Sequence, residues 1–115
     1  MTFTIRALLL VALSAMVPHA ALAQVASEWV NVYEAKVRNG LPYRLMSPVG
    51  FDDNQRYPVI VSLHGAGGRG TDNRKQLKQW NQQLAGERIR KDYPCYVLAP
   101  QSTGLWDETH LRMIQ

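Results

Sequence analysis

The 115-residue sequence contains a single cysteine, Cys95, and this scarcity excludes two classes of small protein. One cysteine cannot form an internal disulfide, and the chain has no Cys/His spacing typical of a zinc site. We therefore expect no metal and no cofactor. Cys95 lies within an apolar segment, which favours a small buried side chain over a catalytic thiol.

The sequence also lacks an apolar run long enough to cross a bilayer as a helix. Residues 7–17 are apolar or small and follow Arg6, and residues 21–23 (Ala-Leu-Ala) match a small-x-small cleavage site. This pattern is typical of a secretory signal peptide, although an uncleaved anchor is an alternative. We expect removal of residues 1–23, export to the periplasm or the medium, and no stable membrane span in residues 24–115.

Long blocks of one charge are absent as well, although the net charge is +4. The basic residues are scattered, and the one local cluster, residues 88–91, is more typical of a solvated helix end. Aromatic and basic residues do not interleave as they do in nucleic-acid-binding surfaces. We therefore expect no nucleic-acid partner.

The first half of the mature chain predicts a β-hairpin. Apolar residues alternate loosely over residues 29–37, and a second strand is expected over residues 41–46. Asn39 and Gly40 stand between these segments, and Asn-Gly is the strongest short hairpin signal.

A strand–helix–strand unit is expected next, so the predicted fold class is α/β. Residues 57–63 are apolar on both faces, which is typical of a parallel strand covered by helices on both sides. Asp72 or Asn73 is a plausible helix N-cap, and residues 95–99 form another apolar strand. Ligands of such sheets bind beyond the carboxyl ends of the strands, where residues 64–70 and 101–106 fall.

Residues 64–70 (His-Gly-Ala-Gly-Gly-Arg-Gly) permit two interpretations. Gly65 to Gly70 match the G-x-G-x-x-G fingerprint of a Rossmann-like nucleotide-binding domain, but the following residues are polar and begin their helix late. The strand over residues 95–99 is also followed by Pro100 instead of a ribose-binding acid. The favoured interpretation is an H-G-G-G-like turn, whose backbone N–H groups stabilise an oxyanion in α/β-hydrolases.

Four segments together resemble a family of secreted esterases. They are residues 41–45 (Leu-Pro-Tyr-Arg-Leu), 63–67 (Leu-His-Gly-Ala-Gly), 69–73 (Arg-Gly-Thr-Asp-Asn) and 99–101 (Ala-Pro-Gln). The family is the polyhydroxybutyrate-depolymerase and feruloyl/acetylxylan-esterase-like branch of the α/β-hydrolases, also described as predicted peptidases or phospholipase/carboxylesterases. The resemblance implies the N-terminal part of an α/β-hydrolase fold and a serine hydrolase acting on a small-molecule or polymer ester.

The resemblance also implies roles for individual residues. Ala66, and next Gly67, would stabilise the oxyanion through their backbone N–H groups, and Trp106 is a possible pocket residue. Residues expected to support the loop are His64, Gly65, Asp72 and Asn73, although an Asx cap at a helix start explains the last two without any function and is the favoured interpretation.

The nucleophile of this family, a serine in a G-x-S-x-G elbow, is missing. The serines are Ser14, Ser27, Ser47, Ser62 and Ser102, and none has that context. His110 lies at the start of an expected helix. The catalytic histidine of this fold follows the serine in the sequence, so His110 does not fit as the partner of a serine further along the chain. We therefore expect residues 24–115 to be the N-terminal portion of a hydrolase domain, without catalytic residues and inactive alone. A small exported binding module without catalysis is a further alternative.

Overall fold

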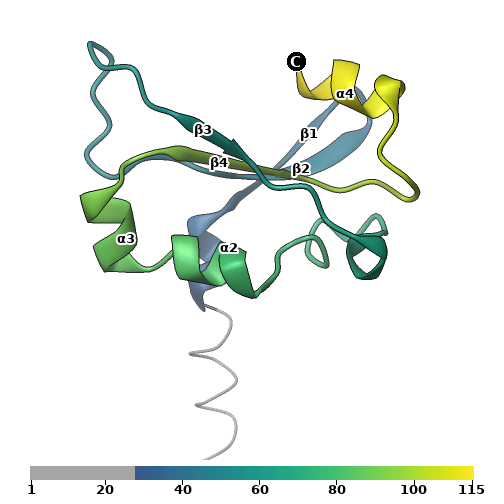
Figure 1. Cartoon of the computed structure of the whole chain (residues 1–115), viewed down its shortest axis with the longest axis horizontal. Coiled ribbons are helices and arrows are strands. Elements are labelled where there is room, and N and C mark those ends of the chain that lie inside the picture. The colour runs from purple at the N-terminus through teal and green to yellow at the C-terminus, as the bar shows by residue number, and fades with distance from the viewer. Residues whose placement is uncertain (1–27) are drawn as a thin grey trace, which may run out of the picture.

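The computed structural model describes residues 28–115, so the predicted signal peptide lies outside the described residues. Figure 1 shows a sheet with short helices on both faces. The elements in chain order are η1 (Trp29–Val32), β1 (Glu34–Arg38), β2 (Leu41–Met46), β3 (Val59–Val61), η2 (Ala66–Gly68), α2 (Gln79–Leu84), α3 (Glu87–Asp92), β4 (Tyr96–Pro100) and α4 (Glu108–Ile114). No helix in this part of the chain has the length and apolar character needed to cross a bilayer.

The four strands form one mixed sheet in the order β1-β2-β4-β3. β1 and β2 are antiparallel, β2 and β4 are antiparallel, and β3 runs parallel to β4. Helices α2 and α3 lie on one face of the sheet and α4 lies on the other, near the C-terminus (Figure 1). The prediction of a hairpin followed by a parallel strand–helix–strand unit is thus confirmed.

The hairpin turn forms where the sequence predicts it. Asn39 and Gly40 both have positive φ angles, 51° and 79°, as a two-residue hairpin turn requires. The first strand is shorter than expected, because residues 29–32 form the 3-10 helix η1 instead. Trp29 in η1 packs edge-on against Tyr33, with ring centroids 6.3 Å apart, and this contact turns the apolar residues of η1 towards the core.

The expectation that β3 is covered on both faces is wrong for the described residues. β3 is the edge strand, and its side chains are exposed, with 57% of Val59 and 47% of Val61 accessible. No described element covers the outer edge of β3, so its apolar side chains remain accessible. The strand is also shorter than residues 57–63, although the N–H of Ser62 extends the pairing by donating to the Leu98 carbonyl at 2.8 Å.

The predicted helix cap at Asp72 or Asn73 is also wrong. Asn73 has a positive φ of 49°, and the side chain of Asp72 accepts from the backbone N–H groups of Arg74 and Lys75 within a loop. The helix that follows this loop, α2, begins only at Gln79, after a cap at Lys78. The physical reason is that the Asp72–Asn73 segment bonds to distant parts of the chain instead of to a helix start.

The core lies between the sheet and the α2–α3 face. Its buried members are Tyr33, Met46, Ala85, Cys95 and Val97, packed by Trp29, Val32, Leu77 and Leu84. Burial raises the pKa of Tyr33 to about 12, and its hydroxyl donates to the Asn81 carbonyl at 2.8 Å. Burial also raises the pKa of the Cys95 thiol, as expected for a packing residue.

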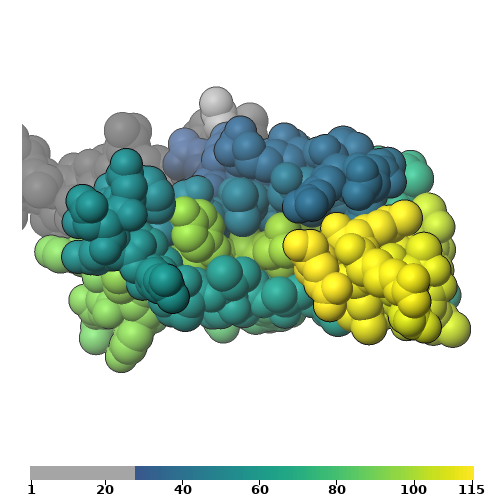
Figure 2. All heavy atoms as spheres, turned by 90° about the horizontal axis from the view of Figure 1, so that it is seen from above, coloured from purple at the N-terminus to yellow at the C-terminus, as the bar shows by residue number. Residues whose placement is uncertain are grey.

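The opposite face of the sheet is covered less completely. Figure 2 views this face and shows α4 over one end, while the neighbouring surface of β4 stays visible. Under α4, an apolar cavity of about 200 Å³ is bordered by side chains that include Tyr43, Leu45, Leu98, Met113 and Ile114. The two faces of one sheet therefore differ in how far side chains pack over them.

Candidate oxyanion turn

The glycine turn after β3 directs its carbonyl groups towards the rest of the protein. Each of the five carbonyls of residues 64–68 accepts a hydrogen bond. The His64 carbonyl accepts from Trp106 Nε1 (2.9 Å), and the Gly65 carbonyl accepts from His64 Nδ1 (2.8 Å) and Gly68 N (3.0 Å). The Ala66 carbonyl accepts from Arg69 N (3.3 Å). The Gly67 carbonyl accepts from Lys78 Nζ (3.0 Å), and the Gly68 carbonyl accepts from Gln101 Nε2 (3.0 Å). A turn rich in glycine is flexible by itself, so these bonds define its shape.

The N–H groups of Ala66 and Gly67 have the opposite orientation. A trans peptide is planar, so the C=O and N–H of one peptide unit point in opposite directions. Fixing the Gly65 carbonyl therefore aims the Ala66 N–H, and fixing the Ala66 carbonyl aims the Gly67 N–H. Both residues are exposed, and neither N–H donates to an acceptor within residues 28–115. Two neighbouring donors are thus available to a ligand.

His64 lies beneath the turn, with only 5% of its surface exposed. Its Nε2 accepts from the Ser102 N–H at 2.9 Å, and its Nδ1 is 2.8 Å from the Gly65 carbonyl. A carbonyl only accepts and a backbone N–H only donates, so these partners place the ring hydrogen on Nδ1. The imidazole thereby links the Ser102 backbone to the peptide unit that carries the Ala66 N–H.

Gly68 permits this packing because it has no side chain. A Cβ at this position would lie 2.4 Å from the His64 Cβ, a distance that real Cβ contacts essentially never show. By contrast, a Cβ at Gly65 would meet nothing within 4 Å. The supporting role of Gly65 stays a prediction, whereas the steric requirement for glycine lies at Gly68.

Gln101 joins the turn to the polar loop that follows it. Its Nε2 donates to the Gly68 carbonyl and to Asp72 Oδ1, the latter at 2.8 Å, while its Oε1 accepts from the Asn73 N–H at 2.6 Å. Only 1% of Gln101 is exposed. The hydrogen bond from Gln101, followed by those from the N–H groups of Lys75 and Arg74, lowers the pKa of Asp72 to about 2.

Asn73 extends the same network to the hairpin. Its Nδ2 donates to the Lys36 carbonyl at 3.2 Å and to the Tyr43 carbonyl at 3.0 Å, and its own carbonyl accepts from Arg44 Nε at 2.7 Å. The residue therefore ties the loop after the turn to both β1 and β2. Sequence reasoning named Asp72 and Asn73 but missed Gln101, Ser102 and Lys78 as partners of the turn.

Trp106 packs against the turn and lies beside His64. Its indole Nε1 donates to the His64 carbonyl, and its ring centroid lies 4.8 Å from that of His64 and 5.5 Å from that of His110. The indole thus contributes to the support of the turn, and a role for Trp106 as a pocket residue stays a prediction.

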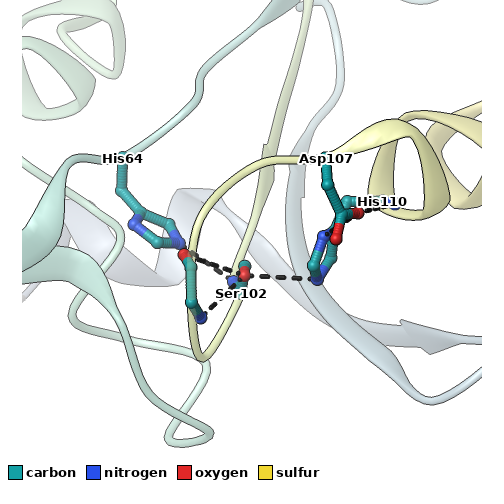
Figure 3. Close-up of polar contacts among 5 residues, drawn as sticks. His64, Ser102, Asp107 and His110 are labelled. Atoms are coloured by element: carbon teal, nitrogen blue, oxygen red, sulfur yellow. Dashed lines mark hydrogen bonds and ion pairs between the residues drawn. The ribbon is translucent and has the colours of Figure 1, made fainter.

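The fold also brings together Ser102, His110 and Asp107, which sequence reasoning did not combine (Figure 3). Ser102 Oγ lies 3.2 Å from His110 Nε2, and His110 Nδ1 lies 2.7 Å from Asp107 Oδ1. The His110 backbone N–H, then its ring, lowers the pKa of Asp107. The Asp107–His110 pair is a helix N-cap visible in the sequence, but only the fold places Ser102 beside it.

This arrangement resembles the order of contacts in a catalytic triad, but the serine is not presented as a nucleophile. Only 1% of Ser102 is exposed, and its Oγ already accepts from the Gly104 N–H at 3.0 Å. Its backbone N–H is used by His64, and its carbonyl accepts from the Gly70 N–H at 3.1 Å. The contacts therefore fix the loop over residues 101–106 against the turn.

A solved structure offers a comparison for this arrangement. The crystal structure of a thermostable esterase is similar to this chain, with 34% sequence identity and a TM-score of 0.56 over 65% of the chain. The chain spans 22% of the length of that esterase. No protein-family model and no curated protein matches the chain. The described residues therefore share an esterase-like arrangement of strands and helices.

Proposed function

We propose that this chain supplies the oxyanion-stabilising turn of an exported carboxylic ester hydrolase whose catalytic serine, acid and base lie outside its 115 residues. One observation carries the proposal: every carbonyl of residues 64–68 is held by the protein, while the N–H groups of Ala66 and Gly67 are left available. Such preorganised donors stabilise negative charge that develops only in the tetrahedral transition state.

The position of the turn in the fold supports the same function. In α/β-hydrolases one oxyanion donor comes from the loop that follows the third strand, and here the turn directly follows β3. The second donor in such enzymes is the residue after the nucleophilic serine. Similarity to an esterase over 22% of that enzyme's length agrees with a chain that carries one part of such a site.

The nucleotide-binding alternative fits the geometry less well. A dinucleotide turn leads directly into a helix whose N-terminus receives the pyrophosphate. Here the helix α2 begins only at Gln79, and the residues between are held in a polar loop. Gly70 is not packed at a helix start, because its N–H donates to the Ser102 carbonyl.

The substitution Ala66→Pro tests the proposal because it removes one N–H and little else. Proline suits the first position of a short helix, and Gly65 before it is already extended, with φ −86° and ψ −165°. The substitution is made in a chimera in which the aligned part of this chain replaces its counterpart in the thermostable esterase. We expect A66P to lower kcat for p-nitrophenyl acetate by about 100- to 1,000-fold without loss of melting temperature.

Two controls separate the alternatives. Ala66→Gly keeps the N–H and is expected to retain activity within about threefold, so equal activities of A66P and A66G would contradict the proposal. The 115-residue chain alone is then treated with a fluorophosphonate probe and is expected to remain unlabelled. Labelling of Ser102 would place the nucleophile inside the chain, and saturable binding of NAD⁺ would favour a nucleotide-binding domain.

A further inference from the structure

Lys78 contacts the turn although no sequence pattern singles it out. Its Nζ donates to the Gly67 carbonyl at 3.0 Å, and a Cβ built on Gly67 would lie 3.7 Å from that nitrogen. The other carbonyls of residues 64–68 are held by backbone N–H groups or by uncharged side chains. Lys78 thus brings a positive charge directly to the peptide unit beside the two available N–H groups.

The backbone of Lys78 is well placed to hold this contact. It caps α2, and its N–H donates to Asn81 Oδ1 at 2.8 Å. Asn81 is fully buried, and its Nδ2 donates to Ser62 Oγ at 2.9 Å. The start of α2 is therefore tied to the end of β3, just before the turn begins. A long side chain that starts from this fixed point reaches the Gly67 carbonyl.

The peptide unit between Gly67 and Gly68 needs such an anchor. Two adjacent glycines lower the steric barrier to rotation of the peptide that joins them, because glycine tolerates both signs of φ. The N–H of this unit donates to the Gly65 carbonyl at 3.0 Å, and its C=O accepts from Lys78. A rotated unit would lose both bonds and would turn a carbonyl towards the side on which the Ala66 and Gly67 N–H groups lie.

We propose that Lys78 is a positioning residue of the oxyanion turn, which anchors the Gly67 carbonyl and prevents rotation of the Gly67–Gly68 peptide. This inference rests on the proposed function for its catalytic consequence, whereas the anchoring itself is a property of the chain.

The anchoring is measured on the full ¹⁵N-labelled chain by amide hydrogen exchange and NMR. In Lys78→Met, we expect the protection of the Gly68 N–H to fall about tenfold and its resonance to broaden or split. Lys78→Arg, which keeps a charged donor, is expected to restore protection to within about threefold. Lys91→Met, at an exposed lysine of α3, serves as the matched control and should leave Gly68 unchanged.

Unchanged Gly68 protection in K78M, or an equal loss in K91M, would overturn the proposal. If K78M does not fold, Lys78→Gln keeps a neutral donor on a shorter side chain and allows the same comparison with K78R.

The catalytic consequence is measured in the esterase chimera. There K78M should lower kcat about tenfold with KM changed less than about twofold, and K78R should recover most of kcat. A purely structural role would lower the melting temperature and would not separate kcat from KM in this way. If A66P leaves activity intact while K78M still releases Gly68, the proposed function fails and the anchoring stands. If A66P abolishes activity and K78M changes neither readout, the inference about Lys78 fails alone.

Discussion

The strand β3 and the glycine turn that follows it are neighbours in the chain, but they differ in their contacts with the rest of the protein. The turn of residues 64–70 is polar and glycine-rich, yet side chains from two other segments, Lys78 and the loop of residues 101–106, hold its carbonyls. β3 is apolar, yet its side chains are exposed at the edge of the sheet. The part that composition alone would call flexible is therefore the part whose carbonyls the protein holds by hydrogen bonds.

This contrast teaches that hydrogen bonds, more than apolar burial, define the candidate site. The turn obtains its shape from hydrogen bonds to its backbone carbonyls. Loss of a buried donor would leave its carbonyl without a partner and would lower the free energy of unfolding. Within the described residues, β3 is held in the sheet by its hydrogen bonds to β4 alone. Changes on the two sides of this boundary should therefore have different consequences.

The largest effect is expected from removing the space between the turn and His64. Gly68→Ala places a Cβ 2.4 Å from the His64 Cβ, so the turn must shift and lose its carbonyl bonds. We expect the free energy of unfolding to fall by about 3 kcal/mol, as for other overpacked sites. Urea unfolding measures this change. Gly65→Ala, with open space around its Cβ, is the control, and equal stabilities of the two variants would contradict the steric argument.

A smaller effect on stability, but a clear effect on association, is expected at the sheet edges. β1 carries the charged residues Glu34, Lys36 and Arg38, whereas β3 carries none. Charged side chains protect edge strands from pairing with other chains. We expect Val61→Lys to reduce self-association of the chain in sedimentation velocity, with a change in unfolding free energy below about 0.5 kcal/mol.

Val37→Lys, at an exposed position of β1, is the matched control and should leave association unchanged. Equal behaviour of V37K and V61K would show that β3 is not the vulnerable edge.

The smallest effect concerns acid stability of the turn. Hydrogen bonds lower the pKa of Asp72 from 3.8 to about 2, so its carboxylate stabilises the fold above the unfolded pKa. That contribution is lost as the pH falls from about 4 towards 2. Asp72→Asn removes the titrating group, so its melting temperature should depend less steeply on pH over this interval than that of the original chain. Parallel curves for the two proteins would exclude Asp72 as the source of the pH dependence.

The parts of the fold that the sequence predicts correctly are those with local causes. Asn39 and Gly40 adopt the positive φ angles of a hairpin turn because of their own steric properties. The apolar segments that become β3 and β4 pair in parallel, as two such strands joined by a helical connection are expected to do. No knowledge of distant contacts is needed for either prediction.

The parts that fail depend on partners far along the chain. Asn73 looks like a helix cap within its own window, but its side chain bonds to Lys36 and Tyr43, which are 37 and 30 residues away. The contact of Ser102 with His110 likewise requires the fold, because only the Asp107–His110 capping pattern is local. The motif suffices to propose Ala66 and Gly67 as candidate donors, whereas the side chains that hold the carbonyls of the turn become visible only in the fold.

The side chains that support the turn come from residues later in the sequence than the turn itself, and this order has a consequence for biosynthesis. The side chains from outside the turn that hold its carbonyls belong to Lys78, Gln101 and Trp106, all of which leave the ribosome after the turn itself. Contacts between distant residues form slowly because the intervening chain must first be ordered. The turn should therefore acquire its shape only after residue 106 has been synthesised, late in folding, when the loop beyond β4 closes over it.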